Sequence, residues 1–263
     1  MANPFFYFVV FLFGLTIGSF LNCVIFRLET KESFLKGRSR CLYCKHILSW
    51  KDLIPVFSFL VLKGKCRYCG KKISFQYPLV EFFTAILFTF IFFIYRAQIF
   101  IDLLFYWILT CFLIVIFVYD LKHYLIPDQV IHPAIFLTLL YQFFKVWNFG
   151  HWNLSGIWNG VFGILPSLFF LTVISISRET WMGWGDFKLS ILMGLFLGWP
   201  KILVALFFAF FSGAIVGLIL IFLKLKTMKS QIPFAPFLVS GMFLAMFFGE
   251  KIIDWYLKLI LVK

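Results

Sequence analysis

Long apolar runs separated by short polar segments constrain this chain more than any other feature of its sequence. Runs of roughly 20 apolar residues recur along the chain, and each is long enough as a helix to cross a hydrocarbon core of about 30 Å. With 63% hydrophobic, 22% aromatic and only 13% charged residues, the composition is far from that of a soluble globular domain. The sequence therefore predicts an all-α polytopic membrane protein.

The apolar runs predict about eight transmembrane helices. The first helix is expected at about 4–26, and the second opens at Pro78 and ends near Tyr95. The other runs lie at about 103–119, 130–147, 157–176, 187–199, 202–223 and 233–248. The C-terminal segment 255–263 is too short to span, and we expect it to lie along the outer interface as an amphipathic helix.

Positive charges set the expected orientation. The net charge is +13, and the Lys and Arg residues lie mainly in the polar segments between apolar runs. These charges therefore indicate membrane topology and not a nucleic-acid partner. No basic region precedes the first run, and Arg27 follows it, which favours a retained first helix with the N-terminus outside. Alternating spans then place on the cytoplasmic side Lys122, Arg178, Lys188, Lys224, Lys226 and Lys229.

The polar segment 28–77 is the one candidate for a soluble subdomain, between a first transmembrane helix in 1–27 and a transmembrane core in 78–263. It contains two CxxC pairs separated by 21 residues, a spacing that suits tetrahedral zinc: Cys41, Cys44, Cys66 and Cys69. Because the segment has few apolar residues, a metal would supply folding free energy that burial cannot. Two disulfides are the alternative, which a cytoplasmic location disfavours. A closed four-cysteine site has no position for a reacting water, so we expect a structural ion.

Four acidic residues at helix ends require an explanation, because charge at membrane depth is costly: Glu81, Asp120, Asp128 and Asp186. Asp120 closes the third apolar run and Asp186 opens the sixth, so both are expected at the cytoplasmic boundary. Two carboxylates that lie close together share a proton and can activate water against a peptide carbonyl. Gly183 and Gly185 would let a substrate backbone approach Asp186. The alternatives are that Asp186 or Asp128 is a helix N-cap and that Glu81 complements a helix dipole.

Several stretches together resemble the bacterial type IV prepilin peptidases, also called leader peptidase/N-methyltransferases, which are aspartyl membrane proteases of the Gly-x-Gly-Asp type. They run in family order over nearly the whole chain: Gly18-Ser19-Phe20-Leu21-Asn22 with Arg27, the two CxxC pairs enclosing Asp52-Leu53-Ile54-Pro55, Tyr77-Pro78-Leu79-Val80-Glu81, Asp120 through Ile126-Pro127-Asp128, Gly183-Trp184-Gly185-Asp186-Phe187-Lys188, and Ile232-Pro233-Phe234-Ala235-Pro236-Phe237. One departure is Ala235, where many relatives have Gly.

The resemblance implies a bacterial inner-membrane endopeptidase. Its essential aspartates map to Asp120 and Asp186, while Asp128, Lys188 and the two loop glycines take supporting roles. Its substrates would be prepilins and the pseudopilins of type II secretion, cut after a short basic leader at the cytoplasmic boundary. The resemblance also implies methylation of the new N-terminal residue with S-adenosylmethionine. No Gly-x-Gly-x-x-Gly unit is present, so the methyl-donor site must be built differently.

Two other classes of protein would share parts of this sequence. A polytopic transporter would use boundary carboxylates to bind cations or relay protons. Its acids usually lie at the midplane, whereas those here lie at span ends, and no repeated broken helices occur in two halves. A zinc-bearing membrane scaffold would explain the cysteines but leaves the Gly-Trp-Gly-Asp loop without a role.

Overall fold

The computed structural model describes residues 4–30, 39–96, 100–148, 154–180, 182–227 and 230–261. These residues form helices, joined by turns and two isolated β-bridges. Lys229 and residues 31–38 of the expected subdomain lie outside the described residues. The helices in chain order are α1 (Pro4–Thr30), η1 (Trp50–Leu53), α2 (Phe57–Val61), α3 (Gln76–Tyr95), α4 (Phe100–His123), α5 (Asp128–Asn148), α6 (Leu154–Ile164), α7 (Ser167–Ser177), α8 (Trp184–Leu197), α9 (Lys201–Phe222) and α10 (Ala235–Leu261).

The expected all-helical membrane fold is confirmed, but fewer than the eight expected spans are both long enough and apolar enough to cross a membrane. Six stretches of the described chain are long and apolar enough to cross a membrane, and they correspond to α1, α3, α4, α6 together with α7, α9 and α10. The other two expected spans correspond to α5 and α8. Since α8 has 14 residues, it extends about 21 Å, which is shorter than a hydrocarbon core.

Two expected spans differ in form from the prediction. The run at 157–176 is divided into α6 and α7 around Pro166, because proline cannot continue the hydrogen bonding of a helix interior. The expected separate helix at 255–263 is wrong for its described part, since α10 continues without a break to Leu261.

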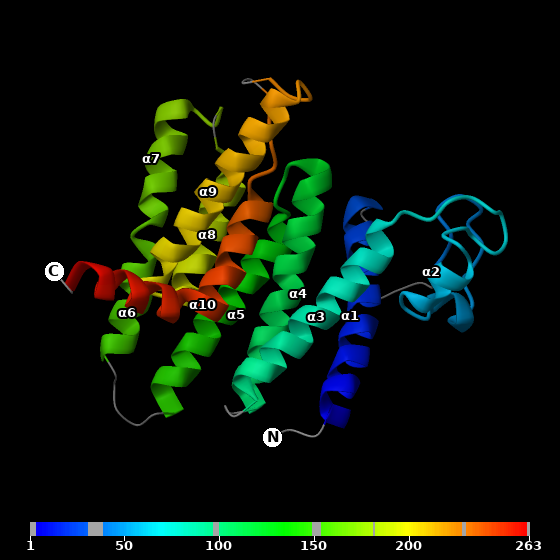
Figure 1. Ribbon diagram of the computed structural model, residues 1–263, viewed down its shortest axis with the longest axis horizontal. Helices are drawn as coiled ribbons and strands as arrows, with labels where there is room; N and C mark the ends of the chain where they lie inside the picture. The colour runs from blue at the N-terminus through cyan, green and yellow to red at the C-terminus, as the bar shows by residue number, and fades with distance from the viewer. Residues whose placement is uncertain are drawn as a thin grey trace. The chain divides into compact units, whose positions relative to one another are not determined.

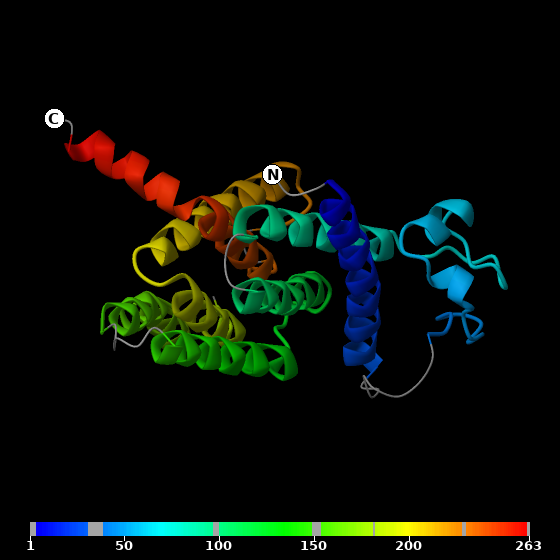
Figure 2. The same ribbon diagram turned by 90° about the horizontal axis from the view of Figure 1, so that it is seen from below.

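The chain forms two compact units, Met1–Val115 and Ile116–Lys263, and α4 contributes to both. In the first unit, α1 packs against α3, and the two helices cross in both views of Figures 1 and 2. A Cβ added at Gly14 would lie 2.6 Å from the Cα of Ala85, and one at Gly18 would lie 2.6 Å from the Cα of Glu81. The two glycines therefore allow a close backbone approach, as small residues do between membrane helices.

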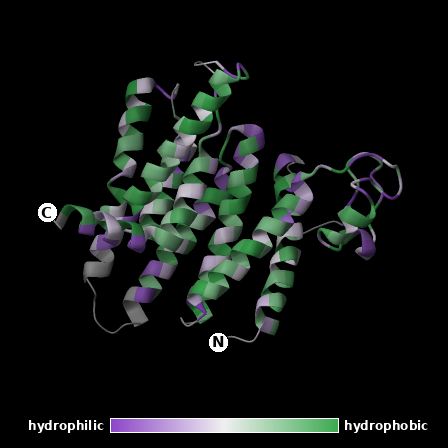
Figure 3. Cartoon of the chain, viewed as in Figure 1, coloured by the Kyte–Doolittle hydropathy of each residue, from purple (hydrophilic) through white to green (hydrophobic). Residues whose placement is uncertain are grey.

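The helices α1 and α3 of the first unit are hydrophobic, whereas the segment between them is largely hydrophilic. Figure 3 shows hydrophobic residues along α1 and α3 and hydrophilic residues in the loops on either side of α2. These loops contain the four cysteines. The position of a polar four-cysteine segment between α1 and α3 agrees with the prediction.

In the second unit, α8 is the central helix. It contacts α5, α6, α7, α9 and α10. A Cβ on Gly194 would lie 2.2 Å from the backbone oxygen of Gly163, so α6 and α8 approach each other through a glycine pair. Leu189, Leu192 and Met193 of α8 are completely buried. This packing fixes the position of the first turn of α8, which contains Asp186.

Candidate functional sites

Asp120 lies in the last turns of α4 and is buried. Its Oδ2 accepts a hydrogen bond of 3.1 Å from the backbone N–H of Ala235. Ala235 is the first residue of α10, and the N–H groups of the first turn of a helix have no partner within that helix. Asp120 therefore supplies an acceptor for one of these N–H groups, and the bond fixes the position of one carboxylate oxygen.

Asp186 is the third residue of α8, and Gly183 occupies the N-cap position. The backbone N–H of Asp186 donates to the carbonyl oxygen of Gly183 at 3.2 Å. The alternative that Asp186 caps the helix is therefore wrong. Its half-buried carboxylate instead interacts electrostatically with that of Asp120. The fold thus brings together two carboxylates from distant parts of the sequence.

Gly185 has a packing role that the sequence did not reveal. A Cβ at this position would lie 2.9 Å from the Cβ of Ile126, which belongs to the loop between α4 and α5. Glycine therefore lets the first turn of α8 pack against the loop that follows Asp120. At Gly183, by contrast, a Cβ would meet only one atom of the described residues, the backbone nitrogen of Gly185 at 3.9 Å, and the approach of a substrate backbone there remains a prediction.

Asp128 and Lys188 pair with each other. Asp128 is the first residue of α5, and its Oδ1 accepts from Lys188 Nζ of α8 at 2.5 Å. Both side chains are partly exposed, and such pairs are typically worth less than about 1 kcal/mol. The pair links the starts of two packed helices.

The four cysteines of the polar segment form a cluster, as predicted. The sulfur atoms of Cys41, Cys44, Cys66 and Cys69 all lie within 4.8 Å of one another, and all four thiols are free. The disulfide alternative is therefore not adopted. Cys41 Sγ and Cys69 Sγ are 3.8 Å apart. Four sulfurs at about 2.3 Å from a tetrahedral zinc ion would be separated by roughly this distance.

The two CxxC segments share one backbone arrangement. The N–H of Cys41 donates to the carbonyl of His46, and the N–H of Cys66 donates to that of Lys71. The residue after each pair has a positive φ, which is 61° at Lys45 and 68° at Gly70. Glycine adopts this left-handed conformation without steric cost in the second segment, whereas the first segment uses lysine at the same place.

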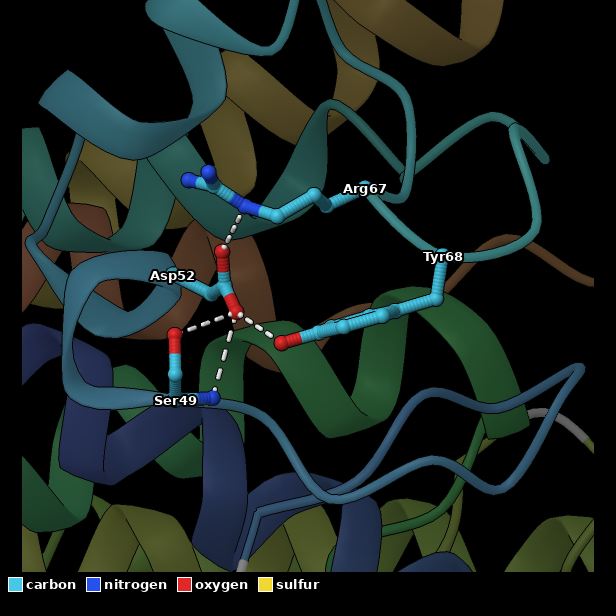
Figure 4. Close-up of polar contacts among 4 residues, drawn as sticks. All are labelled: Ser49, Asp52, Arg67 and Tyr68. Atoms are coloured by element: carbon cyan, nitrogen blue, oxygen red, sulfur yellow. Dashed lines mark hydrogen bonds and ion pairs between the residues drawn. The ribbon is translucent and has the colours of Figure 1, made fainter.

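Asp52 connects the loop between the cysteine pairs with the second pair (Figure 4). Its Oδ1 accepts from Arg67 Nε at 2.7 Å, and its Oδ2 accepts from Ser49 Oγ at 2.7 Å, from the Ser49 backbone and from Tyr68 Oη. Burial acts to raise the pKa of Asp52, but the hydrogen bonds from Ser49 and Arg67 outweigh it, so the pKa of this carboxyl lies below its ordinary value.

Glu81 in α3 also bonds to the polar segment. Its Oε2 accepts from the backbone N–H of Val56 at 2.7 Å. The dipole alternative is wrong, because α3 begins at Gln76 and Glu81 lies beyond its first turn. Sequence reasoning missed this contact, the Asp52 network and the donor at Ala235. Asp52, Glu81 and Ala235 all lie in the motifs quoted above, but a motif does not reveal which atoms its residues contact.

Comparisons with known proteins cover nearly the whole chain. A family model described as the bacterial peptidase A24 N-terminal domain matches residues 12–95. A second model, described as the type IV leader peptidase family, matches residues 107–218. The first match contains the cysteine cluster, and the second contains Asp120 and Asp186.

Individual relatives match both units. The chain is 33% identical to a prepilin leader peptidase/N-methyltransferase of Bacillus subtilis (strain 168), over 96% of this chain and 98% of the relative. A protein of the same name from Aeromonas salmonicida (strain A449) is 33% identical over 98% of this chain and 96% of the relative. One from Legionella pneumophila is 32% identical, over 96% and 95%. No solved structure matches the chain.

Proposed function

The chain belongs to the prepilin leader peptidase/N-methyltransferase family, and from this premise we propose that Asp120 and Asp186 are the catalytic pair of its peptidase reaction. Family membership decides between the enzyme and the transporter or scaffold considered above. The activity is that of a bifunctional enzyme, which removes a leader peptide from prepilins and methylates the N-terminal residue that cleavage exposes.

The observation that carries the assignment is that the fold brings the half-buried carboxylate of Asp186 close enough to the buried carboxylate of Asp120 for the two to interact electrostatically. In the reaction, one carboxylate accepts a proton from water as the water oxygen attacks the scissile carbonyl carbon. The other, protonated carboxyl donates a hydrogen bond to the carbonyl oxygen. As the C–N bond breaks, the leaving nitrogen takes a proton from the pair. The N–H of Ala235 holds one oxygen of Asp120 during these steps.

The position of the pair in the chain supports prepilins and pseudopilins as the proposed substrates. Asp120 lies near one end of a candidate span, and Asp186 lies in the first turn of α8. A prepilin or pseudopilin has a short basic leader on the cytoplasmic side and an apolar helix in the membrane, so its cleavage site lies at the boundary. The proposed enzyme is a multi-pass protein of the bacterial inner membrane, with the N-terminus outside, the cysteine cluster in the cytoplasm and no nucleic-acid partner.

A structural zinc ion is the second part of the proposal. Cys41, Cys44, Cys66 and Cys69 would hold it, and their sulfur separations fit a tetrahedral site. With four protein ligands the ion has no open position, so its contribution would be to the folding of the polar segment.

S-adenosylmethionine is the expected methyl donor. When bound, it would supply a methyl group to the N-terminal amine nitrogen that cleavage exposes, and the amine would release a proton to solvent. The protein must bind the donor beside the amine and exclude competing nucleophiles.

The test is cleavage of a purified prepilin by detergent-solubilised wild type, Asp120→Asn and Asp186→Asn. Glu250→Gln is a matched control, because Glu250 is an exposed acid of the same unit that pairs with Lys201. We expect both aspartate variants to lose cleavage by at least 1,000-fold, as removal of a catalytic group commonly does, while eluting as folded protein in size-exclusion chromatography. Near-full activity in either folded variant would refute the assignment.

A further inference from the structure

The second unit has an open groove of about 410 Å³ along the surface of α10. Its lining comes from one residue of α9 and five of α10: Phe208, Leu244, Phe248, Lys251, Ile252 and Trp255. The single charged side chain of this lining is that of Lys251, and the other five are apolar or aromatic. The groove therefore suits a ligand that combines an apolar part with a negatively charged group.

The dimensions of the groove suit a lipid chain. Its α10 residues follow one another at helical spacing, so they lie on one face of the helix. From Leu244 to Trp255 an α-helix rises about 16 Å. This is roughly half of a hydrocarbon core of about 30 Å, which is the depth that an acyl chain of one leaflet occupies.

The charged end of the groove lies far from the start of α10. Lys201 Nζ pairs with Glu250 Oε1 at 2.6 Å, so this part of α10 lies beside the first residue of α9. The rest of α10 continues past that point and extends beyond α9 in both views (Figures 1 and 2). Lys251 is about 24 Å along the helix from Ala235, which places it near the membrane boundary opposite to that of Asp120.

Lys251 is an exposed cation whose charge the protein leaves unpaired. Lys201 is neutralised by Glu250, whereas no ion pair within the described part of the chain includes Lys251. Lys258 lies on the same face of α10 two turns later, and Trp255 lies between them and is 64% exposed. Tryptophan rings lie at headgroup level at a membrane boundary, and a lysine there extends its ammonium group to the phosphates.

We propose that this groove binds an anionic phospholipid, with one acyl chain along Leu244, Phe248 and Ile252 and the phosphate between Lys251 and Lys258. The negative charge of the lipid complements the two lysines, whereas a zwitterionic lipid offsets its phosphate with its own cation. The inference requires only the membrane-spanning fold of the second unit. It is independent of which residues catalyse peptide cleavage.

The experiment counts lipids bound to the full chain in detergent by native mass spectrometry. The protein is titrated with phosphatidylglycerol or with phosphatidylcholine that has the same acyl chains, and we expect one phosphatidylglycerol to bind more tightly than phosphatidylcholine. Lys251→Gln should lower the affinity for phosphatidylglycerol about fivefold, the loss expected for one cation beside an anionic headgroup. Lys251→Arg should retain the affinity, and Trp255→Ala should weaken the binding of both lipids.

Lys224→Gln is the matched control, because Lys224 is an exposed lysine beyond the other end of α9. Lys224, Lys251 and Trp255 are all exposed, so we expect each variant to elute as folded protein in size-exclusion chromatography. Equal affinity of the wild type for the two lipids would overturn the proposal. An equal loss in Lys224→Gln and Lys251→Gln would also overturn it, because any surface cation would then have the same effect. A loss confined to Lys251→Gln supports the site.

Discussion

The backbone N–H of Ala235 donates a hydrogen bond to Oδ2 of Asp120, which connects the first residue of α10 to the end of α4. This bond gives a physical role to the Pro-Phe-Ala-Pro motif, because the motif places a free helix N-terminal N–H against a buried carboxylate. It also explains why alanine is acceptable at position 235. Ala235 has no positive φ and contributes only its backbone, so glycine is not required for this contact.

Removing that N–H should impair cleavage while preserving the helix. In Ala235→Pro the donor is lost, yet proline is favoured at the first position of a helix. A hydrogen bond to a charged group is worth about 1.5–3 kcal/mol, so we expect kcat/KM for prepilin cleavage to fall roughly 10- to 100-fold. Ala235→Gly retains the N–H and should cleave within about threefold of wild type. Equal activity in the proline and glycine variants would show that the bond does not support Asp120.

Local patterns in the sequence predicted most of the elements. Apolar runs predicted the helices, and the spacing of two CxxC pairs predicted the four-sulfur cluster, because both depend on residues close in the chain. The division between α6 and α7 also had a sequence signal, Pro166 within the expected run. The extent of α10 did not, because helical hydrogen bonding continues past the end of an apolar stretch.

Contacts between distant segments were beyond prediction from one sequence. The residues next to Gly185 in the sequence do not show that a side chain is excluded there. Only the position of Ile126 in the fold shows that a Cβ would clash. Asp186 follows a glycine turn as a capping residue often does, yet Gly183 occupies the cap. Such roles depend on which elements pack together, which neither periodicity nor residue spacing determines.

The close approach of α1 and α3 predicts that Gly18 is needed for stability. In Gly18→Val the new Cβ would lie 2.6 Å from the Cα of Glu81, and backbone cannot move aside as a flexible side chain can. Overpacking of this kind costs about 1–3 kcal/mol, so we expect a lower Tm in detergent, measured by intrinsic fluorescence. Gly160→Ala is the control, because no atom of the described residues lies within 4 Å of a Cβ placed there. An unchanged Tm for Gly18→Val would mean that the two helices do not pack as described.

Metal content provides a direct test of the cysteine cluster. We expect one zinc ion per purified chain by plasma mass spectrometry, and about none in Cys66→Ser, since three ligands leave the site incomplete. Cys111→Ser changes a thiol that lies in α4, outside the cluster, and should retain the metal. Treatment of the wild type with a strong chelator should lower its Tm, because the polar segment has little core of its own. A metal-free wild type with unchanged stability would contradict a structural zinc site.

Breaking the Asp52–Arg67 ion pair should weaken zinc binding, because the pair connects the loop between the two cysteine pairs to the second pair. Asp52 is nearly inaccessible, with 3% of its side chain exposed, while Arg67 is 47% exposed and directly follows Cys66, one of the four proposed zinc ligands. Asp52→Asn removes the charge that orients Arg67, and loss of a residue that supports a metal site typically costs 10- to 100-fold in affinity. We expect roughly a tenfold loss, measured by competition with a chelating dye.

Arg67→Gln should have a similar effect, and the double variant should lose little more zinc affinity than either single variant, because both changes break the same interaction. Fully additive losses would show instead that Asp52 and Arg67 support the cluster independently, through Ser49 and Tyr68 in the case of Asp52.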